Sequence, residues 1–87
     1  MSRIEVYSTP YCPYCARAKA LLDRKGAAYE TIDILDHPDR RPEMVQRSGG
    51  RTSVPQIFID GEHIGGSDDL HALDRAGGLD AKLKLAS

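Results

Sequence analysis

Residues 3–15 have the sequence RIEVYSTPYCPYC, a predicted strand followed by a break and by the start of a helix. Polar and apolar side chains alternate from Arg3 to Ser8, which predicts a β-strand. Thr9-Pro10-Tyr11 interrupts this alternation. From Pro13 to Lys25 apolar side chains recur at helical spacing, and proline suits a first helical position because its missing N–H costs nothing there. Gly26 is the expected end of this helix.

The rest of the chain predicts three more strands and two or three more helices. Asp36 and Ser67 are the expected N-caps of the second and third helices, since both side chains can accept a hydrogen bond from a free backbone N–H. Asp60-Gly61 is typical of a two-residue hairpin turn. The strands are predicted at Ala28–Ile34, Gln56–Ile59 and Glu62–Ile64, and the helices over about ten residues up to Ser48-Gly49-Gly50, from Ser67 to Gly77-Gly78, and over Leu79–Leu85.

This order of elements, β-α-β-α-β-β-α with a possible terminal helix, predicts an α/β fold. The first β-α-β unit implies two parallel strands joined by a right-handed crossover. The later hairpin supplies antiparallel neighbours. We therefore expect a mixed four-stranded sheet with helices on both faces, in a single domain over residues 1–87.

Composition excludes several classes of protein. The net charge of −1 argues against a general affinity for nucleic acid or anionic membrane. No apolar run approaches the roughly 18 residues that a membrane-spanning helix needs. Glu5 lies where a signal peptide requires an apolar segment, so we expect a cytoplasmic protein.

The two cysteines, Cys12 and Cys15, call for a chemical explanation. A permanent disulfide is unexpected in a reducing cytoplasm, and a loop of two residues would constrain the unfolded chain very little. Cys12 lies at the predicted helix start, where free backbone N–H groups and the helix dipole favour the thiolate. Cys15 lies one turn further on and should be more buried and less ionised. Cys12 is therefore the predicted nucleophile, and Cys15 the resolving thiol.

A structural metal site is the alternative interpretation of the pair. Structural zinc usually takes four protein ligands, and the chain has no second pair of cysteines. The three histidines, His37, His63 and His71, do not have metal-ligand spacing among themselves. We therefore expect no metal.

Three segments together resemble one known family. Cys12-Pro13-Tyr14-Cys15 resembles the dithiol motif of class I glutaredoxins, Ser53–Phe58 resembles their Thr-Val-Pro loop, and Gly65–Leu70 resembles their Gly-Gly-x-Asp-Asp-Leu stretch. The order and spacing match over essentially the whole chain, most closely in the small bacterial members. The resemblance implies a thioredoxin fold and glutathione as co-substrate.

The resemblance also implies where glutathione binds. In the family the bond before the residue matching Pro55 is cis, which would expose the backbone of Val54 to the cysteinyl part of glutathione. Tyr14 would flank the sulfur site and shield it.

The glutamyl end of glutathione would lie at the helix that opens with Gly66-Ser67-Asp68. Backbone N–H groups there would take its α-carboxylate, and the Asp68 side chain would take its α-ammonium group. Ser67 and Asp69 have the simpler alternative of capping their own helix. A basic residue that many members carry three positions before the first cysteine is Thr9 here, so Arg51, or less readily Arg47, could supply the charge for the glycine carboxylate.

The predicted activity is glutathione-dependent reduction of protein disulfides and of glutathione mixed disulfides by a monomer. Its partners would be glutathione and disulfide-containing or glutathionylated proteins. Two alternatives remain open. One is an electron donor recharged by thioredoxin reductase, against which Ser67 and Asp68 count. The other is an iron–sulfur carrier in which two chains hold a cluster through Cys12 and two glutathiones, and the proline after Cys12 makes it less favourable.

Overall fold

The computed structural model of this 87-residue chain describes residues 3–83. The elements follow the predicted order, with the terminal helix present. The last helix was predicted over Leu79–Leu85, and residues 84 and 85 of that prediction lie outside the described residues. The elements are β1 (Ile4–Ser8), α1 (Pro13–Arg24), β2 (Glu30–Asp33), the 3₁₀ turn η1 (Pro38–Arg40), α2 (Arg41–Arg47), β3 (Gln56–Ile59), β4 (Glu62–Gly65), α3 (Ser67–Arg75) and α4 (Gly78–Leu83).

The four strands form one mixed sheet in the order β2-β1-β3-β4. β1 runs parallel to β2 and antiparallel to β3, and β3 and β4 form the antiparallel hairpin. The expected mixed four-stranded sheet is therefore confirmed. In the hairpin turn Asp60 and Gly61 both have positive φ, 53° and 83°, as a tight two-residue turn requires.

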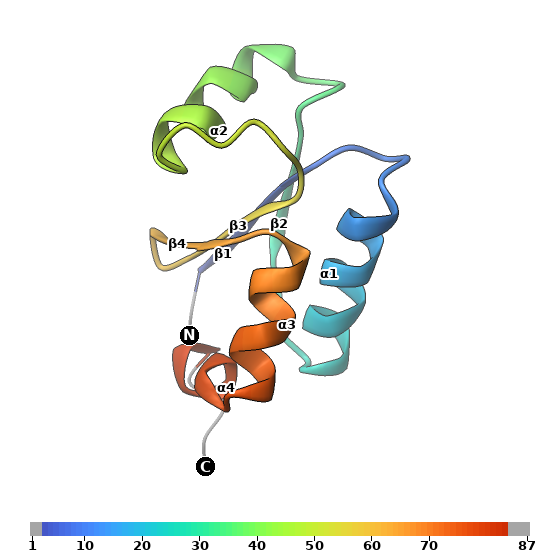
Figure 1. Ribbon diagram of the computed structural model, residues 1–87. Coiled ribbons are helices and arrows are strands. Elements are labelled where there is room, and N and C mark those ends of the chain that lie inside the picture. The colour runs from blue at the N-terminus through green and yellow to red at the C-terminus, as the bar shows by residue number, and fades with distance from the viewer. Residues whose placement is uncertain (1–2, 84–87) are drawn as a thin grey trace.

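Helices cover both faces of the sheet, as Figure 1 shows. All five residues of β1 are buried, and its side chains alternate between two cores. Val6 packs with residues of α1, α3 and α4, including Leu22 and Leu70. Tyr7 packs on the opposite face with Phe58 and with residues of β2 and α2. β1 is thus one of the two inner strands of the sheet. The chain that follows it places Cys12 at one end of the sheet.

The predicted cap at Asp36 is wrong. The carboxylate of Asp33 instead accepts the backbone N–H groups of Leu35 and Asp36, at 2.9 and 3.2 Å, and forms a turn directly after β2. Helical structure begins only at Pro38, as a 3₁₀ turn. Pro42 has no N–H to donate to the carbonyl of Pro38, so α-helical hydrogen bonding cannot run through both prolines.

The second strand is shorter than the predicted Ala28–Ile34. Its pairing with β1 runs from Glu30 to Asp33, and beyond it the N–H of Ile34 donates to the carbonyl of Ser8 at 3.0 Å. Within residues 3–83, no helix combines the length and apolar character needed to cross a bilayer.

Candidate functional site

Cys12 is the N-cap of α1. Its backbone is extended, with φ −94° and ψ 115°, and Pro13 takes up the first helical turn as predicted. The N–H of Cys15 donates to the sulfur of Cys12 across 3.4 Å. Both cysteines are free thiols, and Cys12 is the more exposed of the two. A sulfur held in this way at a helix N-terminus lies where the helix dipole and the free N–H groups favour negative charge.

Cys15 has the opposite surroundings. Only 1% of it is exposed, which confirms that it is the more buried thiol. Burial raises the pKa of Cys15 to about 11, and a backbone hydrogen bond from Thr9 opposes the rise. Contact with Cys12 adds to the rise. Ionisation of Cys15 is therefore strongly disfavoured by its surroundings.

The segment before β3 approaches the cysteine pair from the other side. Its Val54–Pro55 bond is cis, as the family resemblance implies. The carbonyl oxygen of Val54 lies 3.8 Å from the sulfur of Cys12. A backbone group of this segment thus lies directly beside the more exposed sulfur.

A surface hollow of about 210 Å³ opens next to this contact. Its walls come from the start of α1, the segment before β3 and the start of α3. All seven residues predicted to contact glutathione line it, together with Ser53 and Asp69, which were not among them. The lining residues are Tyr14, Arg51, Ser53, Val54, Pro55, Gly66, Ser67, Asp68 and Asp69.

The start of α3 differs from the prediction in its cap. Gly66 is the N-cap and Ser67 the first helical residue, so the prediction of Ser67 as the cap is wrong. The carboxylate of Asp69 takes over the capping, because it accepts the N–H of Gly66 at 2.9 Å. It reaches that position only because Gly65, at φ 122°, has no side chain: a Cβ atom there would lie 2.3 Å from Oδ2 of Asp69.

Arg51 spans the hollow toward α3. Its guanidinium donates to the Asp69 carboxylate at 3.1 Å. The hydrogen bond from the Gly66 N–H is the largest cause that lowers the pKa of Asp69, and the hydrogen bond from Arg51 lowers it further. Asp69 is therefore a fixed negative charge that holds both the cap of α3 and the position of Arg51. The capping role was the alternative that the sequence offered for Asp69, whereas the pairing with Arg51 was not evident from sequence, since it depends on the approach of two segments 18 residues apart.

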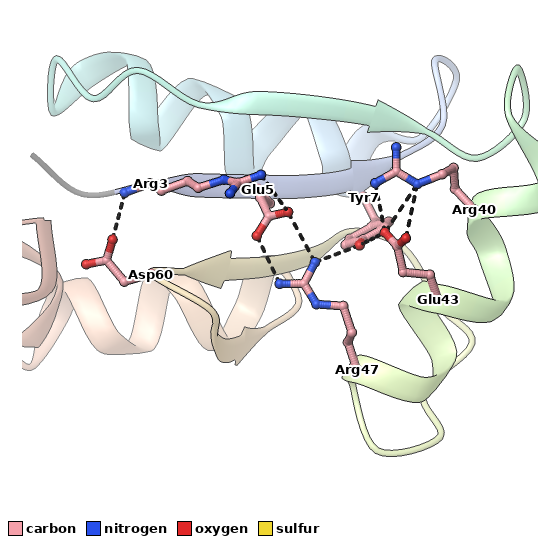
Figure 2. A network of polar contacts seen from close by, with 7 residues as sticks. All are labelled: Arg3, Glu5, Tyr7, Arg40, Glu43, Arg47 and Asp60. Carbon is pink, nitrogen blue, oxygen red and sulfur yellow. Dashed lines mark hydrogen bonds and ion pairs between the residues drawn. The ribbon is translucent and has the colours of Figure 1, made fainter.

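Arg47, the other candidate for a carboxylate ligand, lies away from the hollow. Figure 2 shows its guanidinium against Glu5, at 2.9 and 3.2 Å, and against the hydroxyl of Tyr7, at 2.7 Å. It also lies over the ring of Phe58, 4.2 Å from the ring centre. Arg47 therefore anchors α2 to the sheet, and Arg51 is the arginine at the site. Among residues 3–83, no three His, Cys, Asp or Glu side chains are grouped to hold a metal ion.

Known proteins resemble this chain over nearly its whole length. A family model described as Glutaredoxin matches residues 4–64. Glutaredoxin 3 of Escherichia coli strain K12 is 56% identical over 84 residues, which are 97% of this chain and 100% of the relative. Glutaredoxin of Pseudomonas aeruginosa is 51% identical over 83 residues, 95% of this chain and 98% of the relative.

Solved structures give the same result. The structure of a buckwheat glutaredoxin–glutathione complex matches with a TM-score of 0.87 and 37% identity, over 97% of this chain and 78% of that one. The solution structure of glutaredoxin from Brucella melitensis matches with a TM-score of 0.81 and 55% identity, over 94% of this chain and 88% of that one. The expected thioredoxin-like fold is therefore confirmed.

Proposed function

This chain belongs to the glutaredoxin family of glutathione-dependent thiol–disulfide oxidoreductases, and we propose that Cys12 is the nucleophile of its reaction. The observation that supports this most directly is the position of the Cys12 sulfur, at the N-cap of α1 and within 3.4 Å of the Cys15 N–H. The attacking species in disulfide exchange is the thiolate, and this position favours negative charge on sulfur.

The principal reaction is removal of glutathione from a glutathionylated protein thiol. The Cys12 thiolate attacks the glutathione sulfur, the protein–glutathione S–S bond breaks, and the protein leaves as a thiolate that takes up a proton. A Cys12–glutathione disulfide remains. A second glutathione thiolate then attacks the glutathione sulfur of this disulfide, which releases oxidised glutathione and restores Cys12. Each cycle therefore consumes one free glutathione: the glutathionylated protein and one glutathione give the reduced protein thiol and oxidised glutathione.

Cys15 serves the reduction of disulfides within or between proteins. After Cys12 has formed a mixed disulfide with the substrate, Cys15 attacks Cys12 and expels the second substrate thiol. Cys12 carries no charge in the mixed disulfide, so its contribution to the high pKa of Cys15 disappears at that stage. Two glutathiones then reduce the Cys12–Cys15 bond.

The hollow beside Val54 is the proposed glutathione site. The backbone N–H and C=O of Val54 pair with the cysteinyl residue of glutathione, as in an added strand. The glutamyl α-carboxylate binds the N–H groups of Ser67 and Asp68 at the start of α3, and the Asp68 side chain takes the α-ammonium group. Gly66, the N-cap of α3, lines the hollow beside these N–H groups.

Arg51 is the proposed partner of the glycine carboxylate. Its ion pair with Asp69 uses one edge of the guanidinium, and a guanidinium has five N–H donors in all. Tyr14, with 53% of its surface exposed, borders the hollow and shields the reacting sulfurs. Thr9, in the position where many family members are basic, leaves Arg51 as the cation for this carboxylate.

We also propose that the chain acts as a monomer of one domain in the cytoplasm. The potentials of glutaredoxins, about −200 to −230 mV, lie close to the cytosolic glutathione potential measured biochemically, about −220 to −260 mV. Exchange between the two is then easily reversed. The proposed protein partners are glutathionylated or disulfide-containing proteins.

A turnover assay tests this proposal. The wild type, Cys12→Ser and Cys15→Ser are compared with a glutathionylated peptide as substrate, glutathione as reductant and glutathione reductase for recycling. We expect the wild type and Cys15→Ser to turn over and Cys12→Ser to be inactive. A Cys12→Ser variant that retains activity would refute Cys12 as nucleophile. A wild type that is inactive with glutathione but active with thioredoxin reductase would refute the glutathione site.

A further inference from the structure

The segment that leads into Val54 is held from behind by side chains. Three consecutive carbonyl oxygens in it each accept a hydrogen bond from a side chain of a neighbouring element. The donors are Ser48 to the carbonyl of Arg51 at 3.1 Å, Arg41 to that of Thr52 at 3.2 Å, and Gln56 to that of Ser53 at 2.9 Å. Backbone carbonyls in a loop are usually left to water, so this arrangement fixes the conformation of the segment.

Gln56 is the innermost of the three donors. It belongs to β3 and is fully buried, with 0% of its surface exposed. Its amide nitrogen must face Ser53, because a carbonyl oxygen can only accept. Its amide oxygen therefore faces the other way, toward Nε2 of His63 on β4, at 2.7 Å. His63 must then carry a proton on Nε2, and both its neutral Nε2–H form and its imidazolium form do so.

His63 is itself held in place. Its ring packs on that of Phe58, with the ring centres 5.0 Å apart. Burial, and after it the nearby charge of Arg51, lower the pKa of His63, whereas Asp69 opposes the change. The chain of hydrogen bonds thus runs from β4 through β3 to the segment beside the cysteines, and every member has its partner.

The peptide unit between Ser53 and Val54 connects this chain to the reaction. In a planar trans peptide the C=O and the N–H point in opposite directions. Gln56 draws the Ser53 carbonyl toward the protein interior, so the N–H of Val54 is directed away from the interior. Within residues 3–83, this N–H has no hydrogen-bond partner. Val54 lines the hollow, so the N–H is available to a ligand there.

We propose that Gln56 and His63 are positioning residues, which aim the Val54 N–H at the cysteinyl backbone of glutathione. The inference rests on the proposed glutathione site and adds to it two residues that contact neither glutathione nor the reacting sulfurs. His63 orients the Gln56 amide, and Gln56 orients the Ser53–Val54 peptide unit.

An exchange equilibrium tests this proposal. In the Cys15→Ser background, Cys12 is converted to its mixed disulfide with 2-mercaptoethanol and then equilibrated with glutathione, and mass spectrometry gives the equilibrium constant. Each side of this equilibrium has one disulfide to Cys12 and one free thiol, so the energies of the sulfur bonds nearly cancel. The two sides differ mainly because glutathione, unlike 2-mercaptoethanol, has a peptide backbone that can pair with Val54. We expect the parent to prefer glutathione and Gln56→Leu to lower the constant about fivefold to tenfold, the equivalent of one net hydrogen bond.

Two substitutions of His63 separate positioning from packing. His63→Phe keeps a ring against Phe58 but has no N–H donor, and we expect about a threefold loss in the exchange constant. His63→Gln gives up the ring but keeps a donor for Gln56, and we expect it to stay within about 1.5-fold of the parent. A merely structural role would lower the unfolding free energy of both variants and leave the exchange constant unchanged, because both mixed disulfides share one folded protein.

The outcomes are distinguishable. If the parent prefers glutathione and folded Gln56→Leu retains that preference within twofold, the positioning role is refuted while the glutathione site stands. If the parent shows no preference, recognition of glutathione at this site is refuted. The positioning role, which depends on that recognition, is then refuted as well. If Gln56→Leu does not fold, the two His63 variants decide: a loss in His63→Phe that His63→Gln restores supports the proposal, and equal constants overturn it.

Discussion

At the scale of single residues, the difference between the two thiols comes from burial within one helical turn. Cys12 caps α1 and is partly exposed, whereas Cys15 faces the core with 1% of its surface exposed. The carboxyl end of β1 brings both cysteines to one end of the sheet. The direction of the first turn of α1 then decides which of them reaches solvent. The same turn therefore supplies an accessible sulfur and a protected one.

The high pKa of Cys15 predicts that it resists alkylation. With a pKa of about 11, only about 0.1% of Cys15 is thiolate at pH 8, the form that reacts. In Cys12→Ser the contribution of Cys12 to the rise in the pKa of Cys15 is lost, but burial, its largest cause, remains. Iodoacetamide should therefore modify this variant, in which Cys15 is the only thiol, at least about tenfold more slowly than it modifies Cys15→Ser. Mass spectrometry of timed samples gives both rates. Equal rates would mean that burial does not protect Cys15.

Thr9→Lys predicts a gain in glutathione affinity. A cation three positions before Cys12 would add a second charge for the glycine carboxylate, and a partly exposed pair of this kind contributes about 0.2–1 kcal/mol. We expect the KM for a glutathionylated peptide to fall by about 1.4-fold to fivefold, with kcat nearly unchanged. The gain should shrink in 0.5 M salt because exposed pairs are screened. Thr9→Gln is the uncharged control, and an equal gain in it would contradict the electrostatic reason.

The cap residues show where sequence reasoning stops at this scale. The difference in burial between the two cysteines and the hairpin turn could be predicted, because each depends on local chemistry, and the cis bond before Pro55 followed from the family resemblance. The predictions of Asp36 and Ser67 as caps were wrong, because each side chain competes with another acceptor nearby in the sequence and the pattern does not rank the two. Asp33 forms the turn after β2, and Asp69 caps α3 while it holds Arg51.

At the scale of elements, a polar network joins β1 to α2. Arg40, Glu43 and Arg47 lie on one face of η1 and α2, and they meet Glu5 and Tyr7 of β1 (Figure 2). The hydroxyl of Tyr7 donates to the Glu43 carboxylate. The network fixes α2, and α2 and its C-cap supply two of the three side chains that hold the carbonyls before Val54, Arg41 and Ser48. The position of the proposed glutathione site thus depends on a helix on the opposite face of the sheet from α1.

Arg47→Met should destabilise the fold in a pH-dependent way. Arg47 is the largest cause of the lowered pKa of Glu5, whose ordinary value is 4.5 and whose side chain is only 9% exposed. Removal of Arg47 leaves the buried Glu5 carboxylate with the longer ion pair to the exposed Arg3, at 3.9 Å, at a cost of about 1–3 kcal/mol near pH 7 after allowance for the partial exposure of Arg47. Urea unfolding measures this cost.

The sign of the pH effect follows from the lowered pKa. Because the folded pKa of Glu5 lies below the unfolded one, its contribution to stability is present above pH 4.5 and is lost as the pH falls through the folded value. The gap between wild type and Arg47→Met should therefore narrow from pH 7 to pH 3. Lys82→Gln removes a cation from a more exposed pair with Glu62 and should cost less than about 1 kcal/mol. A gap that stays constant with pH would exclude Glu5 as its source.

The order and type of the elements could be predicted from periodicity, whereas this network could not. Arg47 looked like one more exposed charge, because its partners Glu5 and Tyr7 lie some 40 residues earlier on an alternating strand. Alternation shows that two faces exist, but not that polar Glu5 would be buried. Its burial depends on the docking of α2, which no local pattern records.

At the scale of the whole molecule, the reacting groups and the last helix, α4, lie at opposite ends of α1. In Figure 1 α1 begins near mid-height on the right and runs down toward the level of α4 at the bottom. α1 has 12 residues and so spans about 18 Å between these ends. At its far end Lys25 pairs with Asp74 of α3 at 2.7 Å and with Asp80 of α4 at 2.9 Å. One lysine thus ties three helices together away from the cysteines.

This separation predicts that Lys25→Gln loosens α4 without affecting turnover. Loss of both ion pairs should let Gly78–Leu83 open more often, so its amide hydrogens should exchange about twofold to fivefold faster, as mass spectrometry can show. The sheet and the cysteine end keep their contacts, so kcat/KM should stay within about 1.5-fold of wild type. Arg24→Gln removes a neighbouring exposed charge as the matched control and should leave exchange in α4 unchanged. A fall in kcat/KM that parallels the faster exchange would mean that the two ends are coupled through α1, and that the site depends on the whole helix rather than on its first turn.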